Sequence, residues 1–289
     1  MAWVNAILQG VLLGGFYALF ACGLSLLFGV MGIINLAHGD IAVIAAFVGV
    51  TLAPAWHIPV VWVFLVVVPL FAVGGYVLQR TLLQASLDRS PFTTLLVTFG
   101  LSVIAENVLL EVFTSNGQSL NIGNLIADSF NPSTAISVSY FSITVLAVAV
   151  VVLSALHLFL ARTTTGRMIR AVADDREAAQ LSGANYRHLF GIAAAIAFAT
   201  VALAGLAYGM YTEFDFQSGT ASLLFAFEAV VIGGMGSIWG TLVGGIVLGV
   251  AQQIGGQINP EWQVLAGHLV FLAVLAVRPR GLFGVRAAA

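Results

Sequence analysis

The sequence has no lysine, one cysteine and few charged residues of either sign. Charged side chains make up 8% of its 289 residues and hydrophobic ones 60%, whereas roughly a quarter of an average soluble domain is charged. Without lysine the chain cannot build a phosphate-binding loop of the G-x-x-x-x-G-K-[ST] type, so the glycine-rich stretch at 233–240 is not one. Cys22 alone cannot form an internal disulfide. These absences indicate a polytopic membrane protein without its own nucleotide chemistry.

Recognisable catalytic and metal-binding patterns are missing as well. The histidines are scattered along the chain, and it contains no H-E-x-x-H pattern, His/Cys cluster or G-x-S-x-G elbow. The net charge of -2 gives no reason to expect a nucleic-acid partner. We therefore expect a chain that is not an enzyme and that carries no metal or cofactor of its own.

Apolar segments fill most of the sequence. They lie at about residues 4–30, 41–53, 59–78, 93–113, 138–161, 189–211, 221–232, 238–256 and 263–277. A transmembrane helix needs about 20 residues, and the second and seventh segments are short for a full crossing. The sequence predicts an all-α polytopic membrane helical bundle of eight or nine spans, one or more of them broken or half-length. These spans form a single transmembrane domain over residues 1–289.

All basic residues are arginines, and they gather in three places. These are Arg80 with Arg89, the segment from Arg162 to Arg187, and a tail with Arg278, Arg280 and Arg286. Because basic residues favour cytoplasmic loops, all three groups are predicted to lie on the cytoplasmic side, and the C-terminus with them. The numbers of apolar segments between the three groups agree with this assignment.

Glycine is abundant, at 31 residues, and several glycines stand one helical turn apart. This spacing occurs in Gly10-xxx-Gly14, Gly240-xxx-Gly244 and Gly245-xxx-Gly249. Small residues at this spacing let neighbouring membrane helices approach closely, so a crowded bundle is predicted. The stretches 10–19 and 240–249 also look alike, which hints at an internal repeat of the kind that transporters often carry.

The segment 162–188 is a polar interruption that contains half of the arginines. It reads as one or two short helices, in which Arg170 and Asp174 stand close enough to pair and Gly183 ends a helix. Small side chains leave a smooth surface at Ala171, Ala173, Ala178 and Ala179. Two interpretations stay open: a docking site for a cytoplasmic partner, and a solvated connector whose arginines only set the topology.

The same segment resembles part of a known family. GRMIRAVADDREAAQLSGAN (166–185) is similar to the cytoplasmic coupling loop of ABC importer permeases, and Glu177-Ala178-Ala179, followed after three residues by Gly183, matches that family's E-A-A-x-x-x-G pattern. The later I-x-L-P part is absent, as is usual in the branch for branched-chain amino acids. GLSLLFGVMGIINLAHGD (23–40) and AVVIGGMGSIWGTLVGGIVLG (229–249) resemble the same branch.

The resemblance implies a permease subunit that moves branched-chain or related amino acids across a bacterial inner membrane. Two separate ATP-binding subunits would bind ATP and Mg, and a second related permease and an extracytoplasmic substrate-binding protein would complete the importer. The loop residues implied to receive the movement of the ATPase are Gly166, Arg167, Arg170, Ala171, Asp174, Glu177, Ala178, Ala179 and Gly183. The alternative is a stand-alone proton-coupled secondary transporter or channel.

Polar residues interrupt the apolar sequence at INLAHGD (34–40), which contains Asn35, His38 and Asp40. Broken backbone at membrane depth is tolerated only where it is buried in protein or lines a cavity, so these three residues are candidates for a translocation path. The other interpretation, which we favour, is a turn on the cytoplasmic side between the first two spans. In that turn Asp40 would cap the next helix.

Two carboxylates, Glu106 and Glu228, lie within apolar segments, where a charged group is costly unless it is paired or hydrated. The family resemblance leads us to expect an amide near Glu106 and a small or neutral residue near Glu228, so both depart from it. They are candidates for the translocation path, where they would meet a substrate ammonium group or titrate. Alternatively, each is a neutral acid that forms a hydrogen bond to a neighbouring helix.

Overall fold

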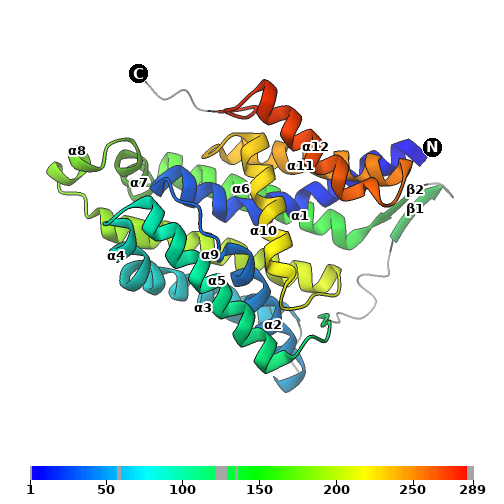
Figure 1. Cartoon of the computed structure of the whole chain (residues 1–289), viewed down its shortest axis with the longest axis horizontal. Helices are drawn as coiled ribbons and strands as arrows, with labels where there is room; N and C mark the ends of the chain where they lie inside the picture. The colour runs from blue at the N-terminus through cyan, green and yellow to red at the C-terminus, as the bar shows by residue number, and fades with distance from the viewer. Residues whose placement is uncertain (1, 57–59, 121–128, 134–135, 285–289) are drawn as a thin grey trace.

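The computed structural model of the chain describes residues 2–56, 60–120, 129–133 and 136–284, and most of this part is helical (Figure 1). The apolar helices are α1 (Ala2–Met31), α2 (His38–Trp56), α3 (Val60–Leu78), α5 (Pro91–Phe113), α6 (Tyr140–Arg162), α9 (Tyr186–Tyr211), α10 (Ser218–Gly233), α11 (Ile238–Ile258) and α12 (Trp262–Val277). Each coincides with one of the predicted apolar segments. Within the described part, six helical spans are long and apolar enough to cross a membrane, and α2, α10 and α12 are shorter. The all-helical membrane architecture is therefore confirmed, whereas the number of eight or nine spans, one or more of them broken or half-length, stays a prediction.

The third apolar helix is longer than its apolar sequence. It continues from α3 through a π-helical segment, η1 (Gln79–Leu83), into α4 (Gln84–Leu87), so that one span runs from Val60 to Leu87. A tight turn at 88–90 then leads into α5. Ser90 caps α5 by accepting a hydrogen bond from the backbone N–H of Thr93 at 3.0 Å, and Pro91 suits the first helical position because its missing N–H would have no partner there.

The centre of the bundle is α1, which packs against α6, α9, α10 and α11. In its most apolar window 78% of the residues are buried, compared with 72% for α9 and 11% for α5. In Figure 1, α11 and α12 lie on one side of α1, and α2, α3 and α5 lie on the other. α5 is therefore a peripheral helix, attached mainly to α2 and α4.

The close approach predicted from the glycine spacing occurs between α1 and α11. A methyl group on Gly14 would lie 2.5 Å from Cα of Ile246, and one on Gly10 would lie 2.5 Å from Cα of Val250. Gly245 and Gly249 face the same contact from α11. The two glycine stretches that resemble each other are thus packed against one another with their helices antiparallel.

Helices α4, α7 (Thr164–Asp174) and α8 (Arg176–Leu181), which carry or adjoin two of the three arginine groups, lie on the left in Figure 1. Arg80 lies beside Gly191 near the start of α9, and Arg176 and Arg187 share one carboxylate partner. The segment after Arg280 is attached to the end of α10, because Leu282 donates a backbone hydrogen bond to Ile232. The three groups predicted to share one side therefore share one end, except that Arg286 lies outside the described residues.

A small hairpin and a backbone pairing lie at the opposite end. Strands β1 (Ser129–Ser133) and β2 (Ile136–Ser139) are antiparallel, and the side chain of Gln9 on α1 donates a hydrogen bond to the carbonyl of Ser137. Gln118 and Phe214 exchange backbone hydrogen bonds of 2.8 and 2.9 Å. The pairing of Gln118 with Phe214 joins two segments that the sequence presented only as loops.

Replacing Gly14 by alanine tests the contact between α1 and α11. We expect Gly14→Ala to cost about 1–3 kcal/mol, because the added methyl group meets backbone rather than a movable side chain. In a protein of this size that corresponds to a fall in Tm of about 3–8 °C, measured by thermal unfolding in detergent. Gly100→Ala is the matched control, since nothing lies within 4 Å of the added methyl group. An equal change in Tm for both variants would contradict the packing argument.

Candidate functional site

The polar segment 162–188 forms two short helices, α7 (Thr164–Asp174) and α8 (Arg176–Leu181), as the sequence predicts. Thr163 caps α7 by accepting a hydrogen bond from the N–H of Gly166 at 2.9 Å. Asp175 caps α8 by accepting hydrogen bonds from Glu177 and Ala178, both at 3.0 Å. Side-chain oxygens satisfy in this way the N–H groups that a helix start leaves unpaired.

Gly183 ends α8, also as predicted. Its φ of +87° is a left-handed conformation that glycine adopts without a steric penalty. The N–H of Gly183 donates to the carbonyl of Gln180 at 2.9 Å, and the N–H of Ala184 donates to that of Ala179 at 3.0 Å. This is the Schellman arrangement of helix ends, and it turns the chain sharply back toward α9.

The two short helices bury one face and expose the other. Ile169 and Val172 are buried in a cluster with residues of α1, α6 and α9, and Ala179 joins the same cluster from α8. Three of the four predicted surface alanines are exposed, but Ala179 faces inward. Leu181 is 92% exposed at the tip of α8. We call α7, α8 and the turn up to Gly183 the coupling element.

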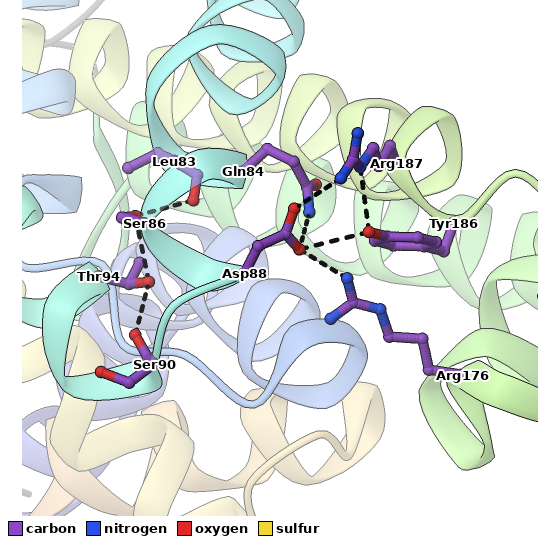
Figure 2. A network of polar contacts seen from close by, with 9 residues as sticks. All are labelled: Leu83, Gln84, Ser86, Asp88, Ser90, Thr94, Arg176, Tyr186 and Arg187. Carbon is purple, nitrogen blue, oxygen red and sulfur yellow. Dashed lines mark hydrogen bonds and ion pairs between the residues drawn. The ribbon is translucent and has the colours of Figure 1, made fainter.

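In addition to this apolar contact, the carboxylate of Asp88 links the coupling element to the turn before α5 (Figure 2). Asp88 accepts hydrogen bonds from Arg176 at 2.7 Å, Arg187 at 3.0 Å, Gln84 at 2.9 Å and the hydroxyl of Tyr186 at 3.3 Å. The guanidinium group of Arg176 also lies 3.7 Å above the ring of Tyr186. Partial burial raises the pKa of the Asp88 carboxyl, but the hydrogen bonds and charges of its partners outweigh this effect and hold the pKa below its ordinary value.

The sequence missed this ion-pair network. The spacing of Arg170 and Asp174 predicted a pair between these two residues. Among the residues that the structure describes, neither forms an ion pair. Asp88 precedes its arginine partners by about ninety residues, so no local spacing could have identified it. An acidic residue next to Arg89 at the end of an apolar segment was the only available signal.

The break at Asn35, His38 and Asp40 lies inside the bundle, which contradicts the interpretation that we favoured. His38 is fully buried, and its Nε2 lies 3.1 Å from the carbonyl oxygen of Phe20. Phe20 precedes the end of α1 by eleven residues, or about 16 Å at 1.5 Å per residue. The chain therefore folds back along α1 after residue 31, and α2 begins well inside the bundle rather than at its cytoplasmic surface.

Asp40 does not cap α2, so that prediction is wrong. Its Oδ2 accepts a hydrogen bond from the hydroxyl of Ser102 on α5 at 2.5 Å, and its side chain lies against Gly219 in the first turn of α10. The N-termini of α2 and α10 thus meet at this carboxylate, where their partial positive charges stabilise it. Asn35 binds the backbone next to the start of α2 instead, because its side-chain oxygen accepts a hydrogen bond from the N–H of Ala37 at 3.1 Å.

Polar side chains recur at every fourth position along one face of α5, at Thr94, Thr98, Ser102 and Glu106. Thr98 accepts a hydrogen bond from the N–H of Leu36 in the break at 3.2 Å. Glu106 accepts one from the hydroxyl of Thr220 on α10 at 2.8 Å. We call this face the polar stripe of α5. It brings Asp40 and Glu106 together with the break between α2, α5 and α10, whereas the ring of His38 faces α1 and α9.

Glu228 lies elsewhere, in a membrane-embedded pair with α12. Its carboxylate is 2% exposed, and Oε1 lies 2.5 Å from Nδ1 of His268. The ring of Phe225 stacks on the imidazole with centroids 6.2 Å apart. Glu106 and Glu228 therefore each contact a neighbouring helix, and a role of either in the translocation path stays a prediction. The sequence offered no pattern for the partner, because His268 stands alone in an apolar helix.

A family model described as "Branched-chain amino acid transport system / permease component" matches residues 6–275. The chain belongs to this family. Its sequence resemblance to branched-chain amino acid permeases is therefore confirmed, and the chain is an integral membrane permease built from apolar helices.

Curated relatives support the same assignment. The permease is 28% identical to the high-affinity branched-chain amino acid transport system permease protein BraD of Pseudomonas aeruginosa, over 98% of this chain and 96% of the relative. It is 27% identical to LivH of Escherichia coli over the same shares. The fructose import permease protein FruG of Bifidobacterium longum is 30% identical over 88% of this chain and 76% of the relative. No solved structure gives a significant match.

The pair between Glu228 and His268 is testable as a double-mutant cycle in this permease. We expect His268→Leu to cost about 2–4 kcal/mol, because it leaves a buried carboxylate without a partner. Glu228→Leu combined with His268→Leu should recover most of this loss, since two apolar side chains replace both polar ones. The measurement is equilibrium unfolding in detergent, with His157→Leu on α6 as the control. A double variant as unstable as His268→Leu alone would contradict the pairing.

Proposed function

We propose that this permease is the transmembrane subunit of an ABC importer whose ATP-binding subunits are separate chains. The exposed coupling element carries the proposal, because it offers Glu177, Ala178 and Leu181 to a partner while Ile169 and Val172 anchor it to the bundle. Leu181 is 92% exposed, so a partner that covers it would remove apolar surface from water. The chain itself has no lysine for a phosphate-binding loop, so a partner must supply ATP and Mg binding.

Two ATP-binding subunits, a second related permease and an extracytoplasmic substrate-binding protein complete the proposed complex. The outward sides of α3 and α5 are suited to contact with a second permease or with lipid. They expose large apolar side chains such as Trp62, Leu65, Phe92 and Phe99. We place the complex in a bacterial inner membrane, with the arginine-rich end and the C-terminus in the cytoplasm. Inward movement of the coupling element would then alternate access to a path between the two permeases.

The proposed substrates are branched-chain or related amino acids. Relatives that match nearly the whole chain are named for branched-chain amino acid transport, and the fructose permeases match less of it. An aromatic cavity between α1, α9 and α10 is a candidate for transient substrate contact, with Phe16, Tyr17, Phe20, Tyr208 and Phe225 in its walls. Most ligand pockets combine such apolar walls with a few polar groups, here the hydroxyls of the tyrosines.

Replacing Leu181 tests docking of the ATP-binding subunits. We expect Leu181→Asp to weaken their binding at least about tenfold, or 1.4 kcal/mol, because it puts a charge into the centre of the contact. The stability of the permease itself should not change, since Leu181 is 92% exposed. The ATPase recovered with the purified permease is measured. Val277→Asp is the matched control, because Val277 is 80% exposed at the end of α12.

Transport by the purified components tests the class of transporter. Liposomes that contain both permeases and both ATP-binding subunits should take up leucine only with ATP and the binding protein, and excess fructose should not compete. This permease alone should show no uptake driven by a pH gradient. Uptake by the single chain that ignores ATP would instead identify a proton-coupled secondary transporter, and competition by fructose would reassign the substrate.

A further inference from the structure

We propose that Asp88 is a positioning residue that transmits movement of the coupling element to α5 and, through the polar stripe, to the break before α2. The proposal rests on the proposed function, because it assumes that a partner ATPase moves the coupling element. It adds to that function a specific mechanical connection between two regions of this chain.

The first part of the connection joins α8 and α9 to the turn before α5. Arg176 at the start of α8 and Arg187 at the start of α9 bind opposite oxygens of Asp88 (Figure 2). Tyr186 contributes both its hydroxyl group and its ring to the same site. A surface ion pair alone is weak, but here four donors converge on one carboxylate, and the ring of Tyr186 holds the guanidinium group of Arg176 in place.

The second part joins Asp88 to α5 through the short turn at 88–90. The N–H of Ser90 donates to the carbonyl of Ser86 at 3.2 Å, which holds the turn closed. The hydroxyl of Ser86 donates to the hydroxyl oxygen of Thr94 at 3.2 Å, so the end of α4 and the first turns of α5 are linked directly (Figure 2). Displacement of Asp88 must therefore displace the start of α5.

The third part is the loose attachment of α5 itself. Few of its residues are buried, and its outward side chains are exposed, whereas its inward face carries the polar stripe. The stripe contacts Leu36 in the break, Asp40 on α2 and Thr220 on α10. A helix held by a few hydrogen bonds can exchange partners at a smaller cost than one held by a close-packed apolar face. Movement of α5 would thus act on the polar region at membrane depth.

The test uses the assembled complex in lipid nanodiscs, with ATP and Mg as the probe. One nitroxide is placed on α5 by Leu96→Cys and one on α12 by Leu272→Cys, in a Cys22→Ala background. Both leucines are more than half exposed. We expect ATP to shift the distance between the labels by an amount on the order of a few ångströms. Asp88→Asn should abolish the shift although the ATPase still binds and hydrolyses ATP.

Transport provides a second readout, as leucine moved per ATP hydrolysed. We expect Asp88→Asn to lower this ratio at least about fivefold and Asp88→Glu, which keeps the charge, to retain most of it. Arg176→Gln removes the same contact from α8 and should act like Asp88→Asn without altering the turn. Arg89→Gln is the control, since Arg89 is adjacent in sequence but takes part in none of the ion pairs of the described residues.

The outcomes separate the two proposals. If no ATPase is recovered with the permease that carries wild-type Asp88, the proposed function fails and the connection fails with it. If the ATPase binds and Asp88→Asn and Arg176→Gln both keep the ATP-dependent shift, the coupling element acts on the bundle by another route. A complex in which the two variants hydrolyse ATP without the shift supports the connection through Asp88.

Discussion

The architecture depends on how closely α1 and α11 approach each other. Lipid is as apolar as the helix surfaces, so membrane helices associate through packing and hydrogen bonds rather than through exclusion of water. Gly14 on α1 and Gly249 on α11 have no Cβ atoms, which lets the two backbones make many short-range contacts. Helix α11 packs on one side of α1, and α9 and α6 pack on its other sides. Helix α1 is therefore the buried centre of the bundle. A larger residue at this contact would separate the helices on which the remaining ones pack.

Around this centre, three carboxylates inside the bundle each contact a polar side chain of another helix. Ser102 donates to Asp40, Thr220 donates to Glu106, and His268 lies against Glu228. Such pairs offset the cost of placing polar groups away from water, and they also fix which helices are neighbours. The break before α2 is tolerated for the same reason, since its backbone is buried against protein rather than exposed to lipid.

The contrast between α1 and α5 connects the fold to transport. α1 is fixed by close packing, whereas α5 is held by a row of hydrogen bonds and by the turn at Asp88. In the mechanism that we propose, α1 stays in place and α5 moves against it. The coupling element packs on α1, α6 and α9 through Ile169 and Val172, and Arg176 also links it to Asp88 in the turn before α5.

The sequence by itself determined the positions of the apolar helices, and it predicted one or two short helices in the polar segment 162–188 with a helix end at Gly183, because apolar runs and glycine act over a few residues. It also identified the family through Glu177, Ala178, Ala179 and Gly183. It could not place the break before α2, and it could not find Asp88 or His268 as partners. Those outcomes are decided by contacts between residues far apart in the chain, and only the packing of whole helices brings such residues together.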